Sequence, residues 1–199
     1  AITFDGAANY VAVDPSYAPP SGTSARTTAA WIKATGLGSI IAWGPNTTSI
    51  KWMMRLDNAT ATYGGLRVEV GGGYVASSQD LVDGQWHHVA AVLPSLANPN
   101  ATDILLYVDG VLQVPLGVGA SPITTPNAPL TIGLDSQNRY FHGVIDEVRI
   151  YNRALSAAEV AALAGATDQC AAAWNRSYYG DAAINWSSDS DGDGFSQLA

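Results

Sequence analysis

The chain has 199 residues, of which 47% are hydrophobic and 13% are charged, which is the composition of a folded protein and not of a disordered one. Seventeen acidic residues against nine basic ones give a formal net charge of -8, and such a surface repels phosphate groups, so nucleic-acid binding is disfavoured. The one cysteine, Cys170, can form no intrachain disulfide. No apolar run approaches the roughly 20 residues of a membrane span, so we expect no membrane insertion.

Short strands are predicted along most of the chain. Runs rich in apolar and β-branched residues, separated by Asp-Gly, Gly-Gly and Pro-containing turns, predict strands at 2–4, 10–13, 27–33, 39–43, 50–56, 66–70, 86–93, 104–108, 130–132 and 144–151. Strands at this spacing, with almost no helical period, indicate an antiparallel sandwich of two sheets. Both faces of 27–33 are apolar, which is typical of an inner strand.

The strand at 86–93 opens with Trp86, which we expect to anchor the core. His87 and His88 follow it directly, and neighbouring residues of a strand point to opposite faces. The pair is therefore not expected to bind one metal ion.

One helix is predicted after the last strand. Ser156 and Glu159 have the spacing of a capping box, the alanine-rich run 160–164 continues the helix, and Gly165 is placed to end it. We expect its apolar side to lie across one end of the sandwich.

Three segments carry a family resemblance. They read DGQWHHVAAVL at 83–93, DILLYVDGVL at 103–112 and GVIDEVRIYNRAL at 143–155. In these segments the chain resembles the laminin-G-like, concanavalin A-like jelly-roll family in its secreted bacterial form, where such a strand, hairpin and closing strand recur in this order. The resemblance covers residues 1–165 and implies an all-β, two-sheet antiparallel jelly-roll with one short helix after the last strand. It also implies a secreted or cell-surface protein.

The composition changes in residues 166–199, which we interpret as a connector and the beginning of a second, truncated module. Asp189, Asp191 and Asp193 occupy positions 1, 3 and 5 of a possible calcium loop, with Gly194 at position 6 for the sharp turn. The segment resembles the calcium loops of dockerin and thrombospondin-type-3 repeats, cut before the acidic ligand of position 12. We expect calcium binding in the intact parent protein, and the alternative is a solvated acidic tail.

The family resemblance also implies a structural calcium ion near the first and last strands. The matching carboxylates are Asp5 and Asp146. The alternative is that Asp5 belongs only to a turn and that Asp146 accepts hydrogen bonds from strand-end amides.

Catalysis is not expected, although glucanases share the jelly-roll fold. Glycoside hydrolysis needs two facing carboxyl groups, and acids at i and i+2 of a strand share a face. Asp146 and Glu147 are adjacent instead, and Glu69 stands alone. The chain also lacks a nucleophile elbow, a zinc-protease motif and a phosphate loop.

Binding is the remaining function class. Sugar recognition pairs an aromatic ring with amides and charged groups, because the ring covers the apolar sugar face while the polar groups fix the hydroxyls. Residues of these types at strand ends and in loops are candidate ligand contacts: Trp43, Asn46, Trp52, Arg55, Asp57, Asn138, Arg139 and Tyr140. We predict a non-catalytic binding module of a larger, multidomain secreted or cell-surface protein, with a glycan as the favoured partner. The alternative is a structural or adhesive spacer that binds a cell-surface protein or no ligand.

Overall fold

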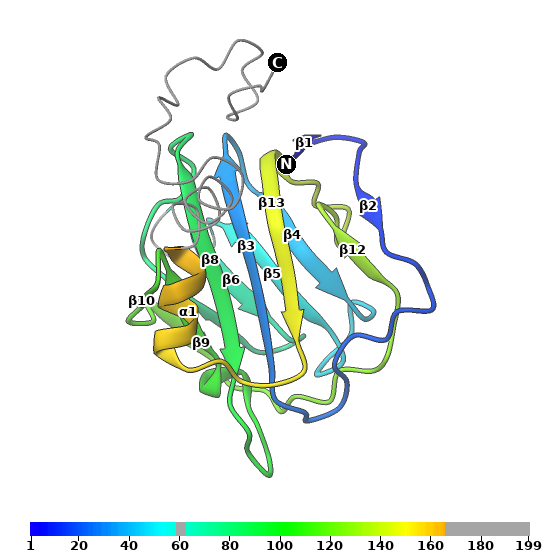
Figure 1. Ribbon diagram of the computed structural model, residues 1–199. Helices are drawn as coiled ribbons and strands as arrows, with labels where there is room; N and C mark the ends of the chain where they lie inside the picture. Colours follow the sequence, from blue (N-terminus) through cyan, green and yellow to red (C-terminus); the bar gives the residue numbers. More distant parts are fainter. Residues whose placement is uncertain (59–62, 166–199) are drawn as a thin grey trace, which may run out of the picture. The chain divides into compact units, whose positions relative to one another are not determined.

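The computed structural model describes residues 1–58 and 63–165, and Ala1–Ala164 forms one compact unit. Two antiparallel sheets pack face to face in this unit (Figure 1). The six-stranded sheet has the order β1 (Ile2–Asp5), β13 (His142–Tyr151), β3 (Arg26–Ala34), β8 (Trp86–Leu93), β9 (Leu105–Val108) and β10 (Val111–Leu112). The seven-stranded sheet has the order β11 (Gly117–Gly119), β7 (Tyr74–Ala76), β6 (Gly65–Glu69), β5 (Trp52–Asp57), β4 (Gly38–Trp43), β12 (Leu130–Ile132) and β2 (Val11–Ala12).

This architecture confirms the predicted two-sheet antiparallel jelly-roll. β3 is buried on both faces, as its apolar pattern predicts. The edge strand β11 and its neighbour β7 are not predicted, because each has three residues and lies next to or contains glycines. The second predicted domain, 166–199, lies outside the described residues. No helix in the described part of the chain has the length and hydropathy to cross a membrane.

The core contains two of the predicted ligand contacts. Trp43 in β4 and Trp52 in β5 are paired in register, their rings stack at 5.8 Å, and they are 2% and 0% exposed. A buried indole offers no surface to a sugar, so the assignment of both tryptophans to the ligand site is wrong. The sequence of β5 contains a signal for this burial, because Trp52, Met54 and Leu56 form an apolar set that alternates with the charged residues Arg55 and Asp57.

Trp86 also differs from the prediction. It is 41% exposed, because the inward positions of β8 begin with His87 and continue through Val89 and Ala91. Trp86 therefore lies on the other face, at the start of the strand.

The helix α1 (Ala157–Ala164) has the predicted cap. The Ser156 amide donates to Glu159 Oε2 at 2.8 Å, and the Glu159 amide donates to Ser156 Oγ at 3.3 Å. The sequence predicted that the helix lies across one end of the sandwich, and this is wrong. The helix lies against the outer face of the six-stranded sheet, beside β8 (Figure 1). Val160 packs there in a small second core with Ala29 and Ala90, whose short side chains leave room for the helix.

Arg26 closes the segment 20–24 over the core. Its fully buried guanidinium donates to the carbonyls of Pro20, Gly22 and Ser24 at 2.8–3.0 Å and lies 5.3 Å from the ring of Trp52. Burial lowers the pKa of Arg26 to about 10, so the side chain stays charged at neutral pH.

Candidate functional site

The outer face of the seven-stranded sheet carries a network of ion pairs, which we call the charged network. Arg55 contacts Asp57 at 2.7 Å and Glu69 at 3.2 Å, and Arg67 contacts the same two carboxylates at 3.1 and 3.3 Å. Lys51 Nζ lies 2.5 Å from Glu69 Oε1. Positions 55 and 57 of β5 face positions 67 and 65 of β6 in register, so alternate residues of adjacent strands bring these charges together.

Both carboxylates of the charged network are ionised at neutral pH. Burial on its own would raise the pKa of Asp57 and of Glu69. The surrounding cations outweigh burial, Arg55 and Arg67 at Asp57 and Lys51 with both arginines at Glu69, so both pKa values lie below their ordinary range.

A pocket of about 400 Å³ opens beside the charged network. Its walls come from β5, from the start of β4 and from the loop between β12 and β13, and its lining residues are Gly6, Leu37, Gly38, Arg55, Leu56, Asp57, Asn58, Asn138, Arg139 and Tyr140. Five of the predicted ligand contacts are thus brought together: Arg55, Asp57, Asn138, Arg139 and Tyr140. We call this cavity the Tyr140 pocket.

The loop that forms one wall of the Tyr140 pocket is held by Asp135. Its buried carboxylate accepts hydrogen bonds from the Gln137 amide at 2.8 Å and from Arg139 Nε at 2.8 Å. Gly38 has a φ of 144°, and a Cβ atom there would lie 2.2 Å from the Tyr140 carbonyl oxygen. A glycine at this position therefore lets the loop lie directly on β4.

Asn46 lies outside the lining of the Tyr140 pocket. Its side-chain oxygen accepts from Lys51 Nζ at 2.6 Å, so Asn46 supports the charged network and does not line the pocket with the other candidates.

Sequence reasoning missed three members of the charged network: Lys51, Arg67 and Glu69. A signal was present, because Arg67 and Glu69 are two residues apart in the predicted strand 66–70, and Arg55 and Asp57 have the same spacing at the end of the predicted strand 50–56. Such pairs share one face of a sheet, and opposite charges on neighbouring strands attract.

Asp5 and Asp146 do not form one site. Asp5 pairs with His142 at one end of β1, whereas Ile2 at the other end pairs with Ile145, so four residues, or about 13 Å of strand, separate the two carboxylates. Asp5 Oδ1 accepts from the amides of Ala7 and Ala8 at 2.9 Å, and these backbone hydrogen bonds, with Ala8 first, lower the pKa of Asp5. The expectation of a shared calcium ion is therefore wrong for this pair.

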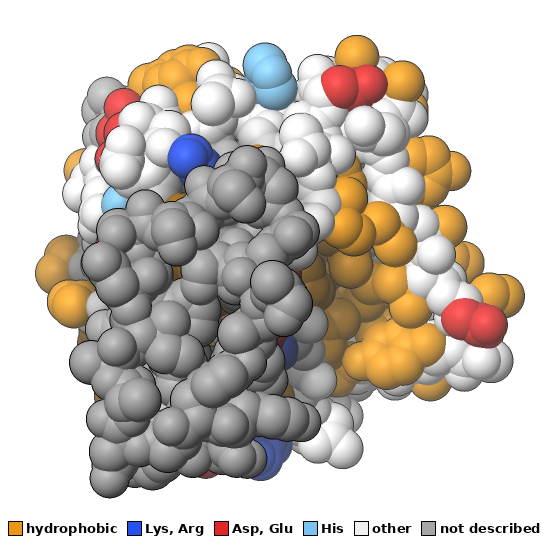
Figure 2. All heavy atoms as spheres, turned by 45° about the horizontal axis from the view of Figure 1, so that its top comes forward, with side chains coloured by type: hydrophobic (Ala, Val, Ile, Leu, Met, Phe, Trp, Pro, Cys, Tyr) orange, Lys and Arg blue, Asp and Glu red, His pale blue; other side chains and the backbone are white. Residues whose placement is uncertain are grey.

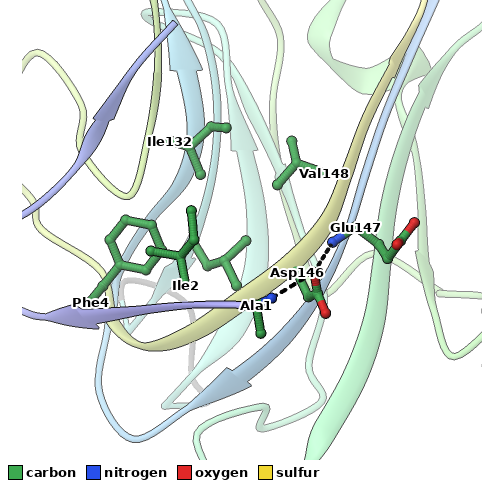
Figure 3. A pocket seen from close by; sticks show the side chains of 8 residues that line it. Ala1, Ile2, Phe4, Ile132, Asp146, Glu147 and Val148 are labelled. Atoms are coloured by element: carbon green, nitrogen blue, oxygen red, sulfur yellow. Dashed lines mark hydrogen bonds and ion pairs between the residues drawn. The ribbon is translucent and has the colours of Figure 1, made fainter. Parts of the chain in front are cut away.

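Asp146 instead contacts the amino group of Ala1 at 3.3 Å, in the wall of a second pocket of about 260 Å³ (Figure 3). Apart from Asp146 and Glu147, the lining of that pocket is apolar: Ala1, Ile2, Phe4, Ile132, Ile145 and Val148. With the top of Figure 1 turned forward, hydrophobic side chains gather on one side of the surface (Figure 2). Among the described residues, the lining of this second pocket lacks the mixture of aromatic, amide and guanidinium residues found in the Tyr140 pocket.

No group of three or more His, Cys, Asp or Glu side chains within 1–58 and 63–165 has the arrangement of a metal site. The candidate calcium loop with Asp189, Asp191 and Asp193 lies outside these ranges, so calcium binding there stays a prediction.

A family model described as the concanavalin A-like lectin/glucanases superfamily matches residues 5–161. The chain belongs to this superfamily. A comparison of this sequence with curated proteins found no significant match.

Solved structures share the fold of this superfamily member. Domain 4 of AbnA, a GH43 extracellular arabinanase from Geobacillus stearothermophilus in complex with arabinotriose, has a TM-score of 0.54 at 20% identity, over 81% of this chain and 87% of that one. The CBM40 of the Ruminococcus gnavus IT-sialidase has a TM-score of 0.53 at 16% identity, over 74% and 84%. The native heptameric SAP-like pentraxin from Limulus polyphemus has a TM-score of 0.53 at 17% identity, over 81% and 80%.

Proposed function

We propose that this chain is a non-catalytic carbohydrate-binding module of a larger secreted or cell-surface protein, and that the sugar binds in the Tyr140 pocket. One observation carries the proposal. Tyr140, Asn58, Asn138 and the ion-paired residues Arg55 and Asp57 line one cavity of about 400 Å³.

These groups match what a sugar requires. An aromatic ring covers the apolar face of a pyranose or furanose, and amides with charged groups exchange hydrogen bonds with its hydroxyls. The volume lies within the range of small-molecule pockets. The arabinanase domain bound to arabinotriose and the sialidase CBM40, which have the same fold, support a glycan as ligand.

The carboxylates argue for binding and against hydrolysis. Glycoside hydrolysis requires two carboxyl groups, of which one is protonated and acts as the general acid. Among the described residues of the pocket lining, Asp57 alone carries a carboxylate, and its pKa is lowered by Arg55 and Arg67. Asp57 is therefore suited to accept hydrogen bonds from a ligand and not to donate a proton to it.

A second candidate function is a structural or adhesive spacer. The burial of Trp43 and Trp52 favours it, because these two indoles would have been the largest stacking surfaces for a sugar.

A glycan array on the purified chain separates the two functions. We expect retention of at least one glycan, and at least a tenfold loss of affinity in Tyr140→Ala and Asn138→Ala. Trp86→Ala is the matched control, because it removes an exposed aromatic side chain on the other sheet. Failure of the folded wild-type chain to retain any glycan would favour the spacer. Glycan binding that survives both pocket variants would show that the sugar binds outside the Tyr140 pocket.

A further inference from the structure

We infer that the Tyr140 pocket selects neutral sugars with adjacent hydroxyl groups over sugars that carry a carboxylate. The inference rests on the proposed function and assigns the class of ligand to the same site. It follows from the state of the two guanidinium groups that line the pocket.

The first of these, Arg55, is already neutralised. Its NH1 group lies 2.7 Å from Asp57 Oδ1 and its NH2 group 3.2 Å from Glu69 Oε2, and its side chain is 8% exposed. An anionic sugar would have to displace one of these carboxylates. Buried ion pairs are poorly screened by solvent, so displacing one costs more than it would at the surface.

The second guanidinium, that of Arg139, is paired with a single carboxylate among the described residues, and its side chain is 27% exposed. Its Nε donates to Asp135 Oδ2 at 2.8 Å, and the side chain of Asp135 is 0% exposed. Because Asp135 Oδ1 is also bonded to the Gln137 amide, this carboxylate is fixed on both oxygens. It cannot turn away to make room for a ligand carboxylate.

The remaining polar groups of the pocket favour hydroxyls. A hydroxyl both donates and accepts, whereas an ionised carboxylate only accepts. Beside Tyr140 the pocket offers the acceptor Asp57 next to the donor Arg55, and the amides of Asn58 and Asn138, which can do either. Two adjacent hydroxyls can satisfy such a pair, whereas a ligand carboxylate would face Asp57 as a like charge.

The charge of the chain acts in the same direction. A formal net charge of -8 produces a negative field that slows the approach of acidic polysaccharides at low salt. A cationic site meant for acidic sugars would need at least one unpaired cation in its wall, and both guanidiniums of this wall are paired.

The test is isothermal titration calorimetry of the whole chain with pairs of oligosaccharides of equal length. One member of each pair is neutral, and the other carries a uronic acid or a sialic acid. We expect at least tenfold tighter binding of the neutral member, with less than a twofold change in its affinity between 20 and 200 mM NaCl. Tighter binding of the acidic member, weakening as salt is added, would overturn the inference.

Two variants test the cause. Asp57→Asn removes one of the two carboxylates paired with Arg55, together with the like charge that faces a ligand carboxylate, and Asp135→Asn removes the carboxylate paired with Arg139. Each variant should therefore reduce the ratio of neutral to acidic affinity by about tenfold. Thermal melting shows which variant is folded, and the second variant keeps the test decisive if the first unfolds. An unchanged preference in the folded variants would show that the ion pairs do not set it.

The failure of this inference can be told apart from failure of the proposed function. Acidic glycans that bind tightly and are lost in Asn138→Ala would contradict the neutral preference alone. No binding of either class to the folded chain would contradict the proposed function itself.

Discussion

His87 and His88 are neighbours in β8, yet their rings lie in opposite electrostatic surroundings. The His87 ring bridges two carboxylates, with Nδ1 at 2.8 Å from Asp109 and Nε2 at 3.3 Å from Asp83. The buried His88 ring packs at 5.5 Å from that of Trp31. This confirms that the two side chains point to opposite faces of the strand.

The two histidines should therefore make opposite contributions to the pH dependence of stability. Burial alone would lower the pKa of His87, but hydrogen bonds to Asp109 and Asp83 outweigh it and the pKa is raised. Burial lowers the pKa of His88 to about 4. A histidine whose pKa is raised by folding stabilises the fold below about pH 6.5, and this contribution is lost as the pH rises through the folded pKa. A histidine whose pKa is lowered by folding stabilises the fold above about pH 6.5, and this contribution is lost as the pH falls toward the folded pKa.

The measurement is the free energy of unfolding of wild type, His87→Gln and His88→Gln between pH 5 and 8. The deficit of His87→Gln should shrink as pH rises above 6.5. The pH-dependent part of the deficit of His88→Gln should grow from pH 5 to pH 7. If the free energy of unfolding of both variants depended on pH in the same way as that of wild type does, the assigned pKa directions of the two histidines would be wrong.

The second prediction concerns the burial of Trp52 and the exposure of Trp86, which is the reverse of what the sequence analysis expects. Trp52→Ala removes a fully buried indole and should cost about 3–5 kcal/mol. Trp86→Ala, at an exposed position, should change stability by about 0.5 kcal/mol or less. Chemical denaturation measures both, and a larger effect in Trp86→Ala would show that the order of burial is reversed.

Breaking the charged network should be costly although the fold would keep its shape. Glu69→Gln leaves Lys51, which is 1% exposed, without its counter-charge and should cost about 3–5 kcal/mol. Glu147→Gln is the matched control, because its ion pair with Arg149 is exposed and is worth about 1 kcal/mol at most. Equal midpoints in urea for the two variants would mean that the network contributes no more than a surface ion pair.

Any calcium response of this chain should arise in the segment 189–194, with weak affinity because the acidic ligand of position 12 is missing, and not in the sandwich. Asp5 accepts hydrogen bonds from backbone amides, and Asp146 in β13 lies beside the opposite end of β1, so neither Asp5→Ala nor Asp146→Ala should alter a calcium response. The combined change of Asp189, Asp191 and Asp193 to Asn should abolish it. Calorimetric titration with calcium measures this, and a response that survives the triple change but is lost in Asp5→Ala would reverse the assignment.

The sequence predicted the sheets well, because turn chemistry and strand propensity are local properties. The capping box of Ser156 and Glu159 is local too, and it formed as expected. The docking of α1 could not be predicted, because it depends on Ala29 and Ala90, which lie far apart in sequence and meet only when β3 pairs with β8.

The sequence predicted some residues of the candidate site and missed others, because strand register decides which side chains share a face. Arg55, Asp57, Asn138, Arg139 and Tyr140 were chosen by residue type, and the fold brings them together. The faces of the tryptophans and the network around Glu69 depend on strand register. A shift of one residue would exchange the inner and outer faces. In β4 both alternate sets contain apolar residues, such as Ile40 and Ile41, so its pattern does not indicate the face of Trp43, whereas the alternation in β5 does indicate the face of Trp52.

The burial of Arg26 has a consequence for how the chain can be altered. Surface loops usually tolerate added residues, because loop closure costs little more as length grows. The segment 20–24 differs, since three of its carbonyls converge on one guanidinium inside the protein. A lysine has three donors but lacks the planar, fixed fork of the guanidinium, so its single nitrogen does not reproduce this geometry. Residues inserted between Pro20 and Ser24 would move those carbonyls away from a charge that has no access to water, so this loop is a poor place for a tag, a linker or a new chain terminus.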